Sequence, residues 1–228
     1  MKTIIITESQ EKMLIREFMQ EGFSLAKLDS IKNLKERIAY CNKYLGEPIG
    51  KGSNRTTFEI SDDSVIKIAN NDIYSQNITE YQNYIKAKQH YPHLLTLFPK
   101  VFQIAEDGTW LIAERVMPLT KDDVQNILGL PALSYREPSL MGFVHWAENI
   151  HAKELPNSID LAIGTTTEEA KQTYKKLTTT NPWFKKLYQY IQSLDRSFTD
   201  IQMGNLGLAL RNNQDTIVII DTGITNII

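Results

Sequence analysis

The sequence contains few of the features that would indicate a secreted, membrane-spanning or nucleic-acid-binding protein. It has one cysteine in 228 residues, so no disulfide can form within the chain and a reducing compartment is favoured. No apolar run approaches the ~20 residues that cross a bilayer, and the run Ile4–Ile6 is too short for a signal peptide. The formal net charge of −2 argues against nucleic acid as the main partner, because binding to phosphates requires a basic surface. We therefore expect a cytoplasmic protein with neither a membrane nor a nucleic-acid partner.

Neither the cysteine nor the histidines form a pattern typical of a catalytic or metal site. Cys41 lies in a predicted helix, where we expect a buried small side chain rather than a nucleophile. His145 and His151 are six residues apart, which is not the His-Glu-x-x-His spacing of a zinc helix. The sequence also lacks the Gly-x-Ser-x-Gly pattern of serine hydrolases. Zinc-dependent and serine-dependent hydrolysis are therefore not indicated.

What the sequence does contain is a glycine-rich segment followed by two strand patterns. Residues 48–53 read Pro-Ile-Gly-Lys-Gly-Ser, and strands are predicted at 56–60 and 65–69. The two glycines of this segment would let its backbone approach a phosphate closely. A P-loop is the competing interpretation, but Gly46 stands one residue too close to Gly50, and a strand follows where a P-loop needs a helix. The pattern favours a glycine loop carried on a hairpin.

A lysine in the second of these strands and a glutamate in the next predicted helix form a candidate ion pair. Lys67 stands between two isoleucines in a run apolar enough for a core strand. Glu80 follows thirteen residues later, inside the stretch 75–89, which is rich in helix formers. Apolar or aromatic residues recur there at helical spacing: Ile78, Tyr81, Tyr84 and Ile85. We expect Glu80 to pair with Lys67; the alternative is a solvated glutamate that contributes little to stability.

Two more strand patterns complete a small sheet. Residues 101–105 and 109–116 flank Glu106-Asp107-Gly108, a run of turn formers, and so predict another hairpin. Its second strand ends in the connector segment Ala113–Pro118. Together with a strand that enters the glycine loop, the predicted order is strand, strand, strand, helix, strand, strand. This order favours an α+β fold with a five-stranded antiparallel sheet.

The residues before this sheet predict two amphipathic helices. Thr7 with Gln10 has the pattern of a capping box, and Asp29 is predicted to cap the second helix. That second helix would carry Ile31, Leu34 and Ile38 on one face. The pair could pack on the sheet as ordinary core or could bind a protein partner, and the sequence leaves both open.

The pattern becomes helical after the connector. Thr120 with Asp123 predicts the start of a short helix. Longer helices are predicted at 139–153, 166–177 and 182–194, the last of which leads toward a polar loop.

Two aspartates and one asparagine near the end of the chain have the arrangement that nucleotide-dependent phosphoryl transfer needs. Four residues separate Asp200 from Asn205, and the apolar, β-branched-rich runs 206–210 and 216–220 predict a hairpin that folds Asp221 back toward Asn205. One carboxylate could then face a substrate hydroxyl while the amide and the other carboxylate hold magnesium. The alternative is that Asp200 caps a turn and Asp221 merely ends a strand.

In this order the motifs resemble those of the protein-kinase-like superfamily, over about residues 46 to 223. The resemblance implies ATP and Mg²⁺ as cofactors, with the loop Gly50–Arg55 covering the ATP phosphates. It implies backbone hydrogen bonds from Glu114 and Val116 to adenine, with Ala113 at the back of the pocket. The implied nucleotide contacts are Gly50, Lys51, Gly52, Ser53, Lys67, Glu80, Ala113, Glu114 and Val116. The implied catalytic residues are Asp200, as base, and Lys67, and the implied metal ligands are Asn205 and Asp221.

The sequence also departs from the pattern of that superfamily. Arg55 or a neighbour stands where a third glycine is usual, and Phe198-Thr199 replace the His-Arg that normally precede the catalytic aspartate. Thr222 replaces the usual phenylalanine, and five residues follow Gly223. We therefore expect neither an activation segment nor the helices on which protein kinases seat a peptide. The alternative is that residues 119–181 or a partner chain provide a platform for a protein substrate.

The resemblance implies a two-lobed, protein-kinase-like fold with a reduced helical C-lobe. The expected divisions are a helical extension at 1–45, an N-lobe at 46–117 and a C-lobe at 118–228. The expected activity is transfer of the ATP γ-phosphate to a hydroxyl of a small molecule or a docked protein. The alternative is a weak or inactive kinase fold, a pseudokinase that binds nucleotide and acts as a scaffold. Short kinase-like chains of this kind also resemble bacteriophage proteins, which makes a role in a phage assembly conceivable.

Overall fold

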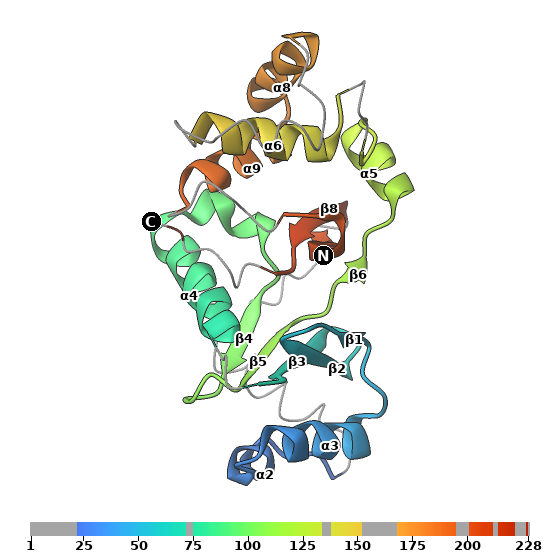
Figure 1. Cartoon of the computed structure of the whole chain (residues 1–228), viewed down its shortest axis with the longest axis vertical. Helices are drawn as coiled ribbons and strands as arrows, with labels where there is room; N and C mark the ends of the chain where they lie inside the picture. Colours follow the sequence, from blue (N-terminus) through green and yellow to red (C-terminus); the bar gives the residue numbers. More distant parts are fainter. Residues whose placement is uncertain are drawn as a thin grey trace, which may run out of the picture. The chain divides into compact units, whose positions relative to one another are not determined.

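The chain folds into two compact units of mixed α+β structure (Figure 1). The computed structural model describes residues 22–71, 75–133, 138–151, 168–194, 201–211, 214–221 and 227. Unit 1 comprises Met1–Tyr81 and Lys100–Arg115, and unit 2 comprises Gln82–Pro99 and Val116–Ile228. The helix predicted to begin at Thr7 lies outside the described residues.

Unit 1 is built on the predicted five-stranded antiparallel sheet. Its strands are β1 (Gly50–Lys51), β2 (Arg55–Ser61), β3 (Ser64–Ala69), β4 (Val101–Ile104) and β5 (Trp110–Glu114). Their order across the sheet is β1-β2-β3-β5-β4, and every pair is antiparallel. Both predicted hairpins are confirmed. In the second hairpin Gly108 takes a φ of 74°, a left-handed conformation that glycine adopts without strain.

Two helices supply part of the core of unit 1. They are α2 (Leu25–Ser30) and α3 (Leu34–Leu45), and α3 packs against β2 and β3 (Figure 1). The core includes Phe23, Leu28, Cys41, Phe58, Ile66 and Trp110. The second predicted helix corresponds to α3, which packs on the sheet; the short helix α2 was not predicted.

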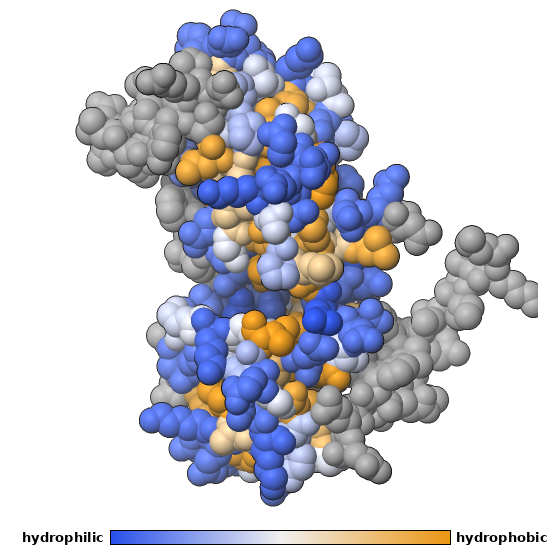
Figure 2. All heavy atoms as spheres, turned by 90° about the vertical axis from the view of Figure 1, so that its right-hand side faces the viewer, coloured by the Kyte–Doolittle hydropathy of each residue, from blue (hydrophilic) through white to orange (hydrophobic). Residues whose placement is uncertain are grey.

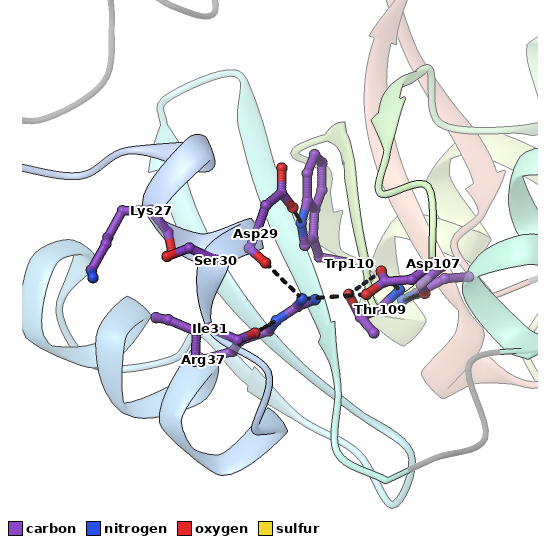
Figure 3. Close-up of polar contacts among 10 residues, drawn as sticks. Lys27, Asp29, Ser30, Ile31, Arg37, Asp107, Thr109 and Trp110 are labelled. Atoms are coloured by element: carbon purple, nitrogen blue, oxygen red, sulfur yellow. Dashed lines mark hydrogen bonds and ion pairs between the residues drawn. The ribbon is translucent and has the colours of Figure 1, made fainter.

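The predicted cap of the second helix is wrong. Asp29 lies inside α2, where its Oδ1 accepts a hydrogen bond of 2.7 Å from Trp110 Nε1 (Figure 3). The cap of α3 is Asn33, whose Oδ1 accepts from the backbone N–H groups of Lys35 and Glu36. Asparagine is as favourable an N-cap as aspartate. The start of this helix could therefore have been predicted at Asn33 instead of Asp29.

Unit 2 combines helices with a second, three-stranded sheet. Its strands are β6 (Met117–Pro118), β7 (Leu206–Arg211) and β8 (Gln214–Ile219), in the order β6-β7-β8. The longer helices are α5 (Lys121–Leu128), α6 (Leu140–His151), α8 (Glu168–Thr180) and α9 (Pro182–Gln192). Two short 3₁₀ helices are η1 (Pro92–Leu97) and η2 (Met203–Asn205). The start of α5 and the bounds of α6, α8 and α9 were predicted within a few residues.

Helix α9 is at the centre of unit 2. It packs against α6, α8 and η1, and buries Phe184, Leu187, Tyr190 and Ile191. Asn181 caps it and Pro182 occupies its first turn, where a missing N–H costs nothing. The predicted start of α5 is also confirmed, because Thr120 and Asp123 form a reciprocal capping box.

The face drawn in Figure 2 presents mostly hydrophilic side chains among the described residues. On the face drawn in Figure 2, hydrophobic surface occurs as small separate areas among hydrophilic side chains. Within the described ranges, no helix has the length and hydrophobicity that crossing a membrane requires.

Cys41 should be chemically inert in the folded protein. Its side chain is fully buried, and burial raises the pKa of the thiol to about 12, against a smaller lowering by the charge of Arg37. We expect alkylation of the native chain to be about a thousandfold slower than alkylation of the urea-unfolded chain, because each pKa unit lowers the thiolate fraction tenfold. Mass spectrometry after iodoacetamide treatment measures both rates. Similar rates would show that the thiol is accessible.

Candidate functional site

Helix α4 (Ser75–His90) turns a polar face inward. Its buried residues include Asn77, Glu80 and Asn83, each 4% exposed or less. The helix itself was predicted, but its buried face was not, since Ile78 of the expected apolar stripe is 37% exposed. A buried polar side chain is tolerated only when it is hydrogen-bonded. The position of α4 therefore depends on specific polar partners.

The predicted ion pair is present in unit 1. Lys67 Nζ lies 2.6 Å from Glu80 Oε1, and both side chains are buried. Strand β3 places Lys67 in the middle of the sheet, opposite Thr57 of β2 and Leu111 of β5. Glu80 is thus not the solvated helix glutamate of the alternative interpretation.

Sequence reasoning missed a second cation on the same glutamate. Arg55 Nη1 lies 2.5 Å from Glu80 Oε2 and 3.4 Å from Asn77 Oδ1. Arg55 is 8% exposed and is the first residue of β2. The sequence suggested Arg55 as the last residue of the phosphate-covering loop and as a replacement for the usual third glycine, but it did not predict the pairing of Arg55 with Glu80. Each oxygen of the Glu80 carboxylate therefore has its own cationic partner.

The two cations keep Glu80 ionised. Burial by itself would raise the pKa of Glu80, but the charges and hydrogen bonds of Lys67 and Arg55 outweigh it and hold this pKa below its ordinary value of 4.5. Opposite charges at hydrogen-bonding distance stabilise the charged form of a carboxyl group. The site consequently holds a permanent negative charge between two positive ones at neutral pH.

The predicted glycine loop joins β1 to β2 and leads directly into Arg55, one of the three residues of the charged cluster Lys67, Glu80 and Arg55. Gly50 pairs with Thr57, and the Gly52 N–H donates to the carbonyl of Arg55 at 2.8 Å. Lys51, Gly52 and Ser53 are exposed. Asn70, at the end of β3, donates its amide to the carbonyls of Gly52 (2.9 Å) and Ser53 (3.5 Å). Sequence reasoning missed Asn70, which holds the loop from the side of β3.

The glycines of the loop are not required by its backbone conformation. A Cβ on Gly50 would meet Thr57 at 3.6 Å, and one on Gly52 would meet the Arg55 carbonyl at 3.5 Å, both ordinary contacts. Neither residue is among the described glycines with positive φ. The fold of unit 1 alone therefore does not explain why both positions are glycine.

The connector residues are divided between the two units. In unit 1, Ala113 is fully buried on β5, and the Glu114 N–H donates to the Lys100 carbonyl at 2.8 Å. In unit 2, a Cβ on Gly207 would lie 2.8 Å from Val116 Cγ2. The absence of a side chain at Gly207 therefore allows Val116 to pack closely beside β7.

The proposed metal ligands come together at one end of the hairpin β7–β8. Leu206 pairs with Ile219, and the Ile220 N–H donates to the Asn205 carbonyl at 2.9 Å. Asp221 follows directly, so the hairpin brings it close to Asn205, as predicted. Asp200, the proposed base, lies outside the described residues.

Comparison with known proteins gives a match by structure only. No protein-family model matches the sequence, and no curated protein matches it. The chain is similar to the streptomycin–ATP–APH(2")-IIa ternary complex, with 16% identity and a TM-score of 0.37, over 86% of this chain and 73% of that chain. It is also similar to the GDP and kanamycin complex of APH(2")-IIIa, with 13% identity and a TM-score of 0.33, over 79% of this chain and 67% of that one.

These solved structures are of aminoglycoside phosphotransferases. The gentamicin complex of APH(2")-IIa is a further example, with 16% identity and a TM-score of 0.35, over 86% of this chain and 72% of that one.

Replacing Glu80 should destabilise the protein in a pH-dependent way. Glu80→Gln leaves two buried cations without a counter-charge, so we expect a loss of about 3 kcal/mol at neutral pH. Because the pKa of Glu80 is lowered in the folded state, its contribution is fully present above the ordinary value of 4.5 and is lost as the pH falls through the lower folded-state pKa. Urea denaturation of both proteins between neutral pH and about pH 3 measures the difference. A difference that stays constant down to about pH 3 would contradict the pairing.

Proposed function

We propose that this protein is an ATP-dependent phosphotransferase. The observation that carries the proposal is the buried Lys67–Glu80 ion pair, which joins strand β3 to helix α4. Lys67 lies opposite Thr57, which pairs with Gly50 of the glycine loop, and residues 51–53 of this loop are exposed. A lysine held in this way presents an oriented positive charge for the α- and β-phosphates of a nucleotide. The expected acceptor is a hydroxyl of a small molecule or a docked protein, and the expected compartment is the cytoplasm.

The loop and the connector would bind the rest of the nucleotide. Glycines at 50 and 52 leave the backbone of the loop open to the close approach of a phosphate. In the proposed arrangement Lys51 and Ser53 belong to this phosphate-covering loop. Ala113 would leave room for the adenine ring, and the backbone of Glu114 and Val116 would form its hydrogen bonds. Positioning and charge stabilisation account for most of the catalysis of phosphoryl transfer.

Asn205 and Asp221 fit a magnesium site in their chemistry. Mg²⁺ prefers carboxylate and amide oxygens, and the backbone hydrogen bond between Ile220 and Asn205 brings these residues to the same end of the hairpin. A bound magnesium ion would neutralise charge on the nucleotide phosphates. Asp200 would accept the proton of the substrate hydroxyl, as base.

Removal of Asp221 should abolish magnesium-dependent nucleotide binding. Calorimetric titration of ATP with magnesium into Asp221→Ala measures this loss directly. Asp215→Ala is the matched control, because Asp215 is exposed on strand β8 of the same hairpin. We expect the control to bind like the wild type. Equal affinity of Asp221→Ala and wild type would remove Asp221 from the metal site.

Removal of Asp200 should spare binding and slow transfer. We expect Asp200→Ala to bind ATP with magnesium normally and to lose about 100-fold or more in rate, or about 3 kcal/mol of transition-state stabilisation. Transfer of labelled γ-phosphate to the protein itself and to a metabolite mixture measures the rate. An unchanged rate would exclude Asp200 as the base. Binding of nucleotide by the wild type without any transfer would instead support the nucleotide-binding scaffold.

A further inference from the structure

The buried polar side chains in the first turns of α4 include Asn77, which the proposed nucleotide chemistry does not use, beside Glu80, which it does. Asn77 and Glu80 are 1% and 4% exposed and lie on the same face of the helix, three residues apart. Ile78, between them, is exposed. Apolar packing tolerates small sliding movements, whereas hydrogen bonds to charged groups fix distance and direction. This end of α4 is therefore positioned by defined contacts.

Arg55 joins the glycine loop to that end of the helix. Its backbone carbonyl accepts the Gly52 N–H at 2.8 Å, which closes the loop. Its guanidinium donates to Glu80 and to Asn77. A rigid, planar group with several donors suits this bridging role better than a lysine would. One residue thus connects the loop, strand β2 and helix α4.

Asn77 extends the same network to the turn between β4 and β5. Its Nδ2 donates to the Gly108 carbonyl at 2.9 Å while its Oδ1 accepts from Arg55. The amide therefore uses both its donor and its acceptor in a buried position. Hydrogen bonds therefore connect helix α4 both to Arg55 of β2 and to the β4–β5 turn.

The turn that receives Asn77 is itself fixed by Arg37 of α3 (Figure 3). Arg37 Nη2 lies 3.3 Å from Asp107 Oδ2, and Asp107 Oδ1 accepts from the backbone N–H of Thr109 at 3.0 Å. Arg37 Nε donates to the Ile31 carbonyl at 2.6 Å, at the end of α2. Arg37 is 3% exposed. The turn is consequently held from the α3 side as well as from α4.

We propose that Arg55 and Asn77 are positioning residues for Lys67, which hold Glu80 so that the Lys67–Glu80 pair is assembled before any nucleotide binds. This inference rests on the proposed function. If the protein binds a nucleotide, a preassembled pair lowers the entropic cost of ordering the site on binding. It also makes nucleotide binding independent of a separate activating movement of α4. The pair is then a permanent feature of unit 1 rather than a switch.

The reactivity of Lys67 in the nucleotide-free protein tests this proposal. Limited acylation with an amine-directed reagent, followed by mass spectrometry, gives the labelling rate of Lys67 relative to that of the exposed Lys35 on α3. We expect Arg55→Met and Asn77→Ala to raise this relative rate about fivefold or more, because local opening exposes the amine more often. Arg55→Lys should restore part of the protection, since it returns a cation to β2. A merely structural role would lower the melting temperature without changing the relative rate.

Glu59→Gln is the matched control. It removes the partly exposed pair between Glu59 and Arg115, whose charged atoms lie 3.1 Å apart, from the same strand β2. We expect this variant to label like the wild type. Asn77→Ala keeps the charges of Lys67, Glu80 and Arg55. It therefore still tests the positioning role if Arg55→Met does not fold. Labelling rates of Lys67 in Asn77→Ala equal to those of the wild type would overturn the proposal.

Titration with ATP and magnesium separates this proposal from the proposed function. If the wild type binds the nucleotide, we expect Arg55→Met and Asn77→Ala to weaken binding about fivefold, in parallel with the labelling. If the wild type does not bind it, the proposed function fails, while the labelling rates still decide whether Arg55 and Asn77 position Lys67.

Discussion

The organisation of unit 1 depends on the burial of one carboxylate. A charge removed from water must be compensated by opposite charges and hydrogen bonds, because an unpaired buried ion costs several kcal/mol. Glu80 is 4% exposed, and Lys67 and Arg55 lie within 2.6 Å of its two oxygens. These contacts fix strands β2 and β3 and helix α4 relative to one another. The resulting arrangement holds Lys67 opposite Thr57, which pairs with Gly50 of the glycine loop.

The same cluster explains what several other residues do in unit 1. Asn77 occupies the space beside Arg55 and connects it to the β4–β5 turn, and Arg37 holds that turn from α3. The N-terminal helices thus contribute both apolar core and a polar support to the sheet. In unit 2, the close packing of Val116 beside Gly207 and the return of Asp221 to Asn205 depend on the sheet β6-β7-β8.

Much of the fold could be predicted because its signals are local. Turn formers such as Glu106-Asp107-Gly108 separate runs of strand residues, and the capping box of Thr120 and Asp123 marks the start of α5. The Lys67–Glu80 pair could be predicted because a charged residue in a core strand needs a partner. The interaction of Arg55 with Glu80 spans 25 positions and belongs to no short motif, so the sequence did not reveal it. The buried polar face of α4 was not predicted for the same reason. The hydrogen-bond partners of Asn77 and Glu80 lie on distant strands and turns, so the apolar periodicity within the helix did not indicate which face is buried.

The most direct test of the account is the melting temperature of the wild-type chain with ATP, GTP or adenosine, each with and without magnesium. A ligand that binds only the folded state raises the melting temperature in proportion to the logarithm of its concentration above Kd. We expect nucleoside triphosphate to stabilise the chain in a way that requires both the phosphates and magnesium, and adenosine to have little effect. A melting temperature that stays unchanged at millimolar ATP with magnesium would contradict it.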